Sequence, residues 1–173
     1  VMPATTTTYT VTVTNANNCT ASASVTITVN SLPSASISVV ESSGSFANDG
    51  ILCNGASATL TANGGTGYLW STTATTAAIS ASTSGSYTVT VTNANGCTSV
   101  TSTTITVHPL PTPSIVVTET SGTPNDGTIC MGASATLTAS GGVSYGWSTG
   151  GAVAGMSVSP ATTTSYTVTV TDA

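Results

Sequence analysis

Four cysteines are the side chains of this 173-residue chain best suited to covalent chemistry, and their placement is regular. Cys19 and Cys97 follow the sequences Asn-Ala-Asn-Asn and Asn-Ala-Asn-Gly. Cys53 and Cys130 are each separated by one residue from Gly-Ala-Ser-Ala-Thr-Leu. Four cysteines in so polar a chain are typical of an oxidising compartment. The sequence therefore predicts disulfide chemistry in a secreted or cell-surface protein.

Three states of these cysteines are compatible with the sequence. The simplest is a disulfide within one repeat, Cys53–Cys97, with Cys19 and Cys130 paired to cysteines outside this segment. A disulfide that closes a loop of this length would stabilise the folded repeat by roughly 3–4 kcal/mol. The second state is a bond between neighbouring repeats, because in a standard sandwich the two positions lie at opposite ends and a disulfide needs close Cα atoms. The third is free thiols. The spacing does not favour zinc, since no Cys-x-x-Cys occurs.

Four of the five acidic residues also recur. Glu41 and Asp49 in one part of the chain match Glu119 and Asp126 in the next, and both aspartates stand in an Asn-Asp-Gly sequence. The first interpretation is turn chemistry, in which Asp and Gly form a tight bend. The second is a calcium site at a junction between repeats, built from these carboxylates and backbone carbonyls. No Asp-x-Asp-x-Asp-Gly pattern supports calcium, and no other cofactor is expected.

The remaining titratable side chains do not form a catalytic pattern. His108 is the only histidine, and the preceding repeat has Asn30 in its place. No acid/base pair stands at repeated positions, so we expect no enzymatic activity. The chain has no Lys or Arg and a net charge of −5. It therefore lacks the cations that bind nucleic acids or an anionic membrane surface, and no apolar run is long enough to insert into a membrane.

The regular placement reflects a tandem repeat. Tyr9, Tyr87 and Tyr166, the two tryptophans Trp70 and Trp147, and the two cysteine pairs all recur at an interval of about 78 residues. We expect a segment of a longer chain, in which Asn-Ser-Leu-Pro and His-Pro-Leu-Pro form stiff junctions. The predicted domains are the C-terminal part of one repeat, one complete repeat, and a repeat that lacks its last strand, at residues 1–30, 31–108 and 109–173.

Each repeat has the pattern of short β-strands. In Tyr-Thr-Val-Thr-Val-Thr (87–92) and Ala-Ser-Ala-Thr-Leu-Thr-Ala (56–62), apolar residues alternate with hydroxyl residues, as in strands with one buried face. No stretch has helical periodicity. Six or seven such strands in about 78 residues, separated by Gly, Asn and Ser turns, predict an all-β fold of tandem β-sandwich repeats.

Each repeat contains one tryptophan, which indicates the side chains that fill the core of the sandwich. We expect Trp70 and Trp147 to be core side chains, together with Tyr87 and Tyr166 at the start of a later strand. The alternative is that the tryptophans, with Tyr68 and Tyr145 two residues earlier, form an exposed aromatic platform for sugars. Exposure of these rings distinguishes the two interpretations.

The combined motif resembles a known family. Cys-x-Gly-x-Ser-Ala-Thr-Leu-Thr-Ala, Tyr-x-Trp-Ser-Thr and Tyr-Thr-Val-Thr-Val-Thr-Asn-Ala-Asn-Gly-Cys are similar to immunoglobulin-like and PKD-like repeats of giant surface adhesins of Bacteroidetes-type bacteria, including gliding-motility adhesins. The resemblance covers essentially the whole chain. It implies tandem immunoglobulin-like sandwiches, type IX secretion and an adhesive or scaffold role without catalytic residues. Asn18 departs from the motif, since it replaces the turn glycine.

These observations predict an extracellular structural or adhesive segment that forms an extended cell-surface fibre or filament. Its expected partners are neighbouring repeats or identical chains, and surface glycans as a further candidate. The alternative is a spacer or carbohydrate-binding accessory module of a secreted polysaccharide-degrading enzyme. A third interpretation is a self-assembling fibre in which a strand of one subunit completes the next.

Overall fold

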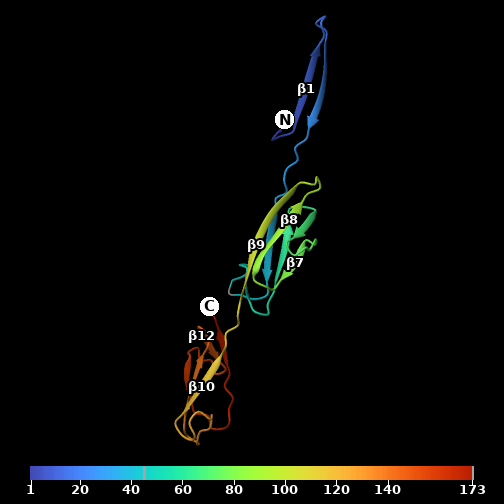
Figure 1. Ribbon diagram of the computed structural model, residues 1–173. Coiled ribbons are helices and arrows are strands. Elements are labelled where there is room, and N and C mark those ends of the chain that lie inside the picture. Colours follow the sequence, from blue (N-terminus) through green and yellow to red (C-terminus); the bar gives the residue numbers. More distant parts are fainter. Residues whose placement is uncertain (45, 173) are drawn as a thin grey trace. The chain divides into compact units, whose positions relative to one another are not determined.

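The computed structural model describes residues 1–44 and 46–172, and all regular structure among them is β-strand. The chain divides into two compact units, Val1–His108 and Pro109–Ala173. In Figure 1 the first unit runs from blue to yellow and the second from yellow to red. The predicted all-β class is confirmed, and the paired sheets described below are consistent with a β-sandwich.

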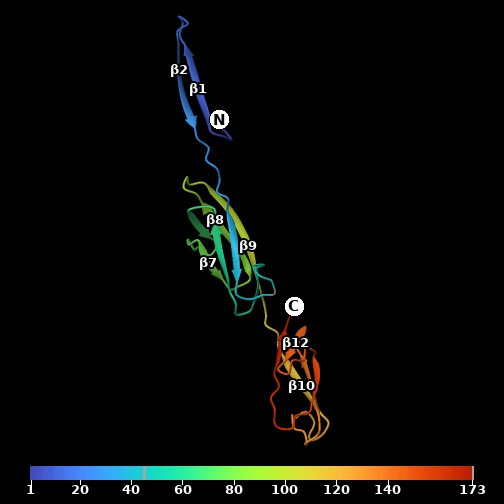
Figure 2. The same cartoon turned by 180° about the vertical axis from the view of Figure 1, so that it is seen from behind.

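The first unit begins with a β-hairpin made of β1 (Thr7–Thr14) and β2 (Thr20–Ile27). The two strands run antiparallel, as Figure 2 shows, with Val11 opposite Ala23. The turn between them is held by the side chain of Asn15, whose Oδ1 accepts the backbone N–H of Cys19 at 3.0 Å. Every side chain of β2 is exposed, so the hairpin has an apolar face without a core.

Seven further strands of the first unit form two sheets. One has the order β3-β5-β7 and the other β4-β9-β8-β6. All pairs are antiparallel except β4 and β9, which run parallel. The bounds are β3 (Ser36–Glu41), β4 (Ile51–Cys53), β5 (Ala58–Asn63), β6 (Gly67–Trp70), β7 (Ala78–Ala81), β8 (Gly85–Thr92) and β9 (Thr98–His108).

Both sheets contribute side chains to the core of these seven strands. Leu60 of β5 is fully buried in the same cluster as Val89 and Val91 of β8 and Ile105 of β9. The threonines that alternate with these valines are only half-buried. Alternation of the two residue kinds therefore separates the core face from the outer face of each strand.

The second unit has five strands in two sheets of order β10-β11-β13 and β12-β14. Its buried residues are fewer, with Leu137, Ala139 and Trp147 at the centre. Residues 128–130, which match β4 in sequence, form no strand, and no described segment of this unit takes the place of β9. The bounds are β10 (Ser114–Glu119), β11 (Ala135–Ser140), β12 (Ser144–Trp147), β13 (Gly155–Val158) and β14 (Val168–Thr171).

Candidate functional site

Both tryptophans are buried in the two cores. Trp70 ends β6 with 2% of its surface exposed, and Trp147 ends β12 with 4% exposed. The indole Nε1–H of Trp70 donates to the Thr76 carbonyl at 3.0 Å, and that of Trp147 donates to the Val153 carbonyl at 2.9 Å. Neither ring offers a face to a ligand, so these residues belong to the scaffold.

Three tyrosines, Tyr68, Tyr87 and Tyr145, donate hydrogen bonds to nearby backbone carbonyls. Tyr87 is buried and its hydroxyl donates to the Thr83 carbonyl at 3.1 Å, whereas Tyr166 is only half-buried. The hydroxyls of Tyr68 and Tyr145 each donate at 2.8 Å to the carbonyl of the second glycine in a Gly-Gly pair, which is residue 65 or 142. With the tryptophans buried, these half-buried rings do not make the flat exposed platform typical of sugar-binding modules.

The recurring acids are bound to their own loops. The Glu41 carboxylate accepts the backbone N–H groups of Asn48 at 2.8 Å, of Asp49 at 3.3 Å and of Gly50. Asp49 Oδ1 accepts the N–H of Ile51 at 2.9 Å. These contacts fold the Asn-Asp-Gly loop over the end of β3. The sequence predicted that the aspartate takes part in a tight turn. It did not predict that the glutamate accepts hydrogen bonds from the backbone of the loop.

The second unit repeats this arrangement. The Glu119 carboxylate accepts the N–H groups of Asn125 at 2.6 Å and Gly127 at 2.7 Å, and Asp126 Oδ1 accepts that of Thr128 at 2.8 Å. No group of three or more His, Cys, Asp or Glu side chains that could hold a metal ion occurs in the described residues. Both oxygens of each glutamate and Oδ1 of each aspartate accept backbone N–H groups, which favours the turn interpretation of Glu41, Asp49, Glu119 and Asp126 over the calcium interpretation.

The cysteines of the complete repeat lie at the two ends of β9. Cys53 ends β4 opposite His108, the last residue of β9, and Cys97 immediately precedes Thr98, the first. Eleven residues at about 3.3 Å each make this strand roughly 35 Å long. A disulfide needs Cα atoms within about 7 Å, and all four cysteines are free thiols in this structure. The pairing of Cys53 with Cys97 is therefore corrected: this fold separates them.

His108, the single histidine of the chain, is the last residue of β9. The His108 side chain is exposed, and its backbone carbonyl accepts the N–H of Asn54 at 2.8 Å. Its role is thus to join the end of β9 to the loop after β4.

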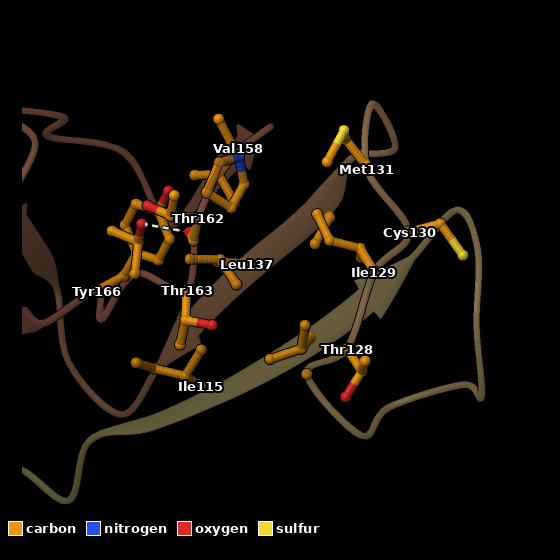
Figure 3. A pocket seen from close by; sticks show the side chains of 16 residues that line it. Ile115, Thr128, Ile129, Cys130, Met131, Leu137, Val158, Thr162, Thr163 and Tyr166 are labelled. Atoms are coloured by element: carbon orange, nitrogen blue, oxygen red, sulfur yellow. Dashed lines mark hydrogen bonds between the residues drawn. The ribbon is translucent and has the colours of Figure 1, made fainter.

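An open apolar groove of about 610 Å³ lies in the second unit. Figure 3 shows Ile129 directed toward Leu137, with Tyr166 on the far side, while the sulfur of Cys130 points away. None of the described residues that line the groove is charged. The sequence gives no direct signal for it, because its residues are ordinary core positions that remain partly uncovered. The lining includes Ile115, Val117, Ile129, Leu137, Val158 and Tyr166.

No family model matches the chain, and no curated protein is significantly similar to it. In the described part of the chain no helix is long and apolar enough to cross a membrane.

Proposed function

We propose that the chain is a non-enzymatic, extracellular structural or adhesive segment of an extended cell-surface fibre, built from tandem immunoglobulin-like repeats. The observation that carries this proposal is the recurrence of one strand arrangement. The order β3-β5-β7 of the first unit returns as β10-β11-β13 in the second, with Val39 opposite Leu60 in one and Val117 opposite Leu137 in the other. Repetition of a whole folding unit adds length rather than a new site.

The chemistry of the surface supports the same proposal. The side chains whose positions recur are used internally: the tryptophans fill cores and the acidic residues hold loops. The thiols of Cys53 and Cys97 stand at opposite ends of their repeat. Thiols at opposite ends of a repeat are compatible with covalent joining of successive repeats in such a fibre.

The alternative, a carbohydrate-binding accessory module, is weakened by the burial of Trp70 and Trp147. A spacer role in a secreted polysaccharide-degrading enzyme needs no exposed ring and stays a second candidate. Affinity electrophoresis of the chain through gels that contain different polysaccharides tests whether it binds carbohydrate. We expect no retardation by any polysaccharide, and retardation would favour the accessory module.

Surface labelling of intact source cells tests the proposal itself. Antibodies raised against residues 31–108 should label unpermeabilised cells, and external protease should remove the label. Labelling that appears only after permeabilisation would contradict an extracellular fibre. Antibodies against a cytoplasmic protein of the same cells provide the control for intact membranes.

A further inference from the structure

The linker before the complete repeat packs against that repeat. Residues 31–35 precede β3 and lie outside any described strand. Pro33 is buried, whereas Leu32 beside it is 69% exposed. Ala35 packs against the core cluster, as Ile37 of β3 does. Alternate residues from Pro33 onward therefore face the repeat, and the linker continues the pattern of β3.

The side chain of Asn93 holds the start of this linker. Its Nδ2 donates to the carbonyl of Ser31 at 2.9 Å, although the two residues are 62 positions apart in the sequence. Its Oδ1 accepts the backbone N–H groups of Asn95 and Cys97, both at 3.0 Å. An amide has an acceptor and a donor on one carbon, so a single side chain closes the turn between β8 and β9 and binds the linker.

Two glycines allow the linker backbone to approach closely. Gly64 has a φ of +102°, and a β-carbon at this position would overlap the carbonyl oxygen of Ser34. In the second unit Gly141 also has a φ of +102°, and a β-carbon there would overlap the carbonyl oxygen of Thr112. Glycine adopts this conformation without a steric cost. The close approach occurs in both units, so it belongs to the folding unit.

The strand before the linker is held by its own hairpin as far as Val29. The N–H of Val29 donates to Thr6 Oγ1 at 3.0 Å. The complete repeat has the matching contact at its own end, where the N–H of Val107 donates to Ser84 Oγ at 2.8 Å. The last contact before the linker and the first contact of the linker are thus two residues apart, with Asn30 between them.

We propose that Asn93 is a clamp that fastens the linker to the repeat after it, and that bending between this repeat and the segment before it is confined to Asn30. The prolines of the junction predict stiffness from local rigidity. The clamp adds a contact from a distant turn. One residue contributes two soft dihedral angles, so this joint has far fewer degrees of freedom than a free linker. The inference goes beyond the proposed function and does not depend on an extracellular role.

NMR relaxation of the backbone amides in the full chain tests the clamp with the variant Asn93→Asp. Aspartate keeps an oxygen for the turn but has no N–H for the carbonyl of Ser31. In the wild type, the order parameters of Ser31 and Leu32 should match those of β5, at about 0.85, and that of Asn30 should be lower. In Asn93→Asp the values for Ser31 and Leu32 should fall below about 0.6. Unchanged values in β5 and β8 show that the repeat stays folded.

Matched variants separate the clamp from side effects of the substitution. Asn15→Asp makes the same exchange in the hairpin, where Oδ1 likewise accepts two turn N–H groups, and should leave the linker ordered. Gly64→Ala should mobilise the linker, because the added methyl group overlaps it. Gly55→Ala introduces similar backbone strain at a φ of +91°, but its β-carbon would meet no atom within 4 Å, so the linker should stay ordered.

Three results would overturn the proposal. The first is a wild-type chain in which Ser31 and Leu32 are as mobile as Asn30, or in which Asn30 is as ordered as β5. The second is an Asn93→Asp variant whose linker keeps its wild-type order parameters, because other contacts would then hold the linker. The third is an equal loss of order in Asn15→Asp, which would assign the effect to the added charge.

Discussion

At the scale of single residues, the repeated glutamate has the clearest local role. Glu41 is half-buried at the end of β3, and its carboxylate accepts three consecutive backbone N–H groups of the loop that follows. A carboxylate that accepts several backbone donors fixes a loop without a metal ion. The recurrence of Glu119 with Asn125 and Gly127 shows that the contact belongs to the folding unit.

Glu41→Ala should lower the free energy of unfolding of the complete repeat by about 1–2 kcal/mol, because its N–H donors lose a charged acceptor. Glu41→Gln keeps one carbonyl acceptor and should lose less. Urea titrations followed by amide resonances of β5 measure both changes. In the same assay, calcium or a chelator should leave the wild-type midpoint unchanged; a midpoint raised by calcium would restore the metal interpretation.

At the scale of the elements, one strand sequence occurs in two environments. Tyr-Thr-Val-Thr-Val-Thr forms most of β8 inside a core and most of β1 in the bare hairpin. Val89 has no exposed surface, whereas the matching Val11 is 61% exposed. Strand formation therefore follows from alternation, whereas burial depends on which other strands are present.

The two valines provide a matched pair of variants. Val89→Asp should lower the free energy of unfolding by more than about 4 kcal/mol, since it buries an unpaired charge. Val11→Asp, in the same local sequence, should change the stability of residues 31–108 by less than about 0.5 kcal/mol. Urea titrations of the two variants test this. Equal losses would mean that the hairpin is buried in solution.

The placement of the cysteines gives another prediction at this scale. Mild oxidation of the dilute chain, followed by peptide mapping without reduction, should yield no peptide pair that links Cys53 to Cys97, because β9 holds them apart. Reagents for free thiols should label both in the native chain, since Cys53 is exposed and Cys97 half-exposed. A bridged peptide containing both residues would contradict the strand order β4-β9-β8.

Much of this architecture could be predicted from the sequence, since alternation of valine or leucine with threonine specifies strands and their buried faces. Trp70 and Tyr87 were predicted as core residues, because each repeat has one tryptophan to fill a small sandwich and the tyrosine starts a core strand, and both are buried. The Cys53–Cys97 bond was not excluded, because it depends on which end of the unit each strand meets. That β4 pairs with the end of β9 is a long-range contact that local patterns do not specify. The groove could not be predicted either, since it depends on long-range contacts among β10, β11 and the loop around Ile129.

At the scale of the whole molecule, the polarity of the chain comes from hydroxyl groups. Only 3% of residues are charged, and the net charge is −5. Low charge permits copies to approach one another without strong repulsion. Repetition is a means of building length from one small fold.

The length of the native polypeptide tests the central claim, which is that these repeats form an extended structural fibre. A denaturing, reducing gel of the source material, probed with antibodies against residues 31–108 and followed by mass analysis, measures it directly. The account predicts a chain of many hundreds of kilodaltons that contains dozens of these units. A chain of modest size, with a few units beside a different folded domain, would contradict it and favour a spacer in a secreted enzyme.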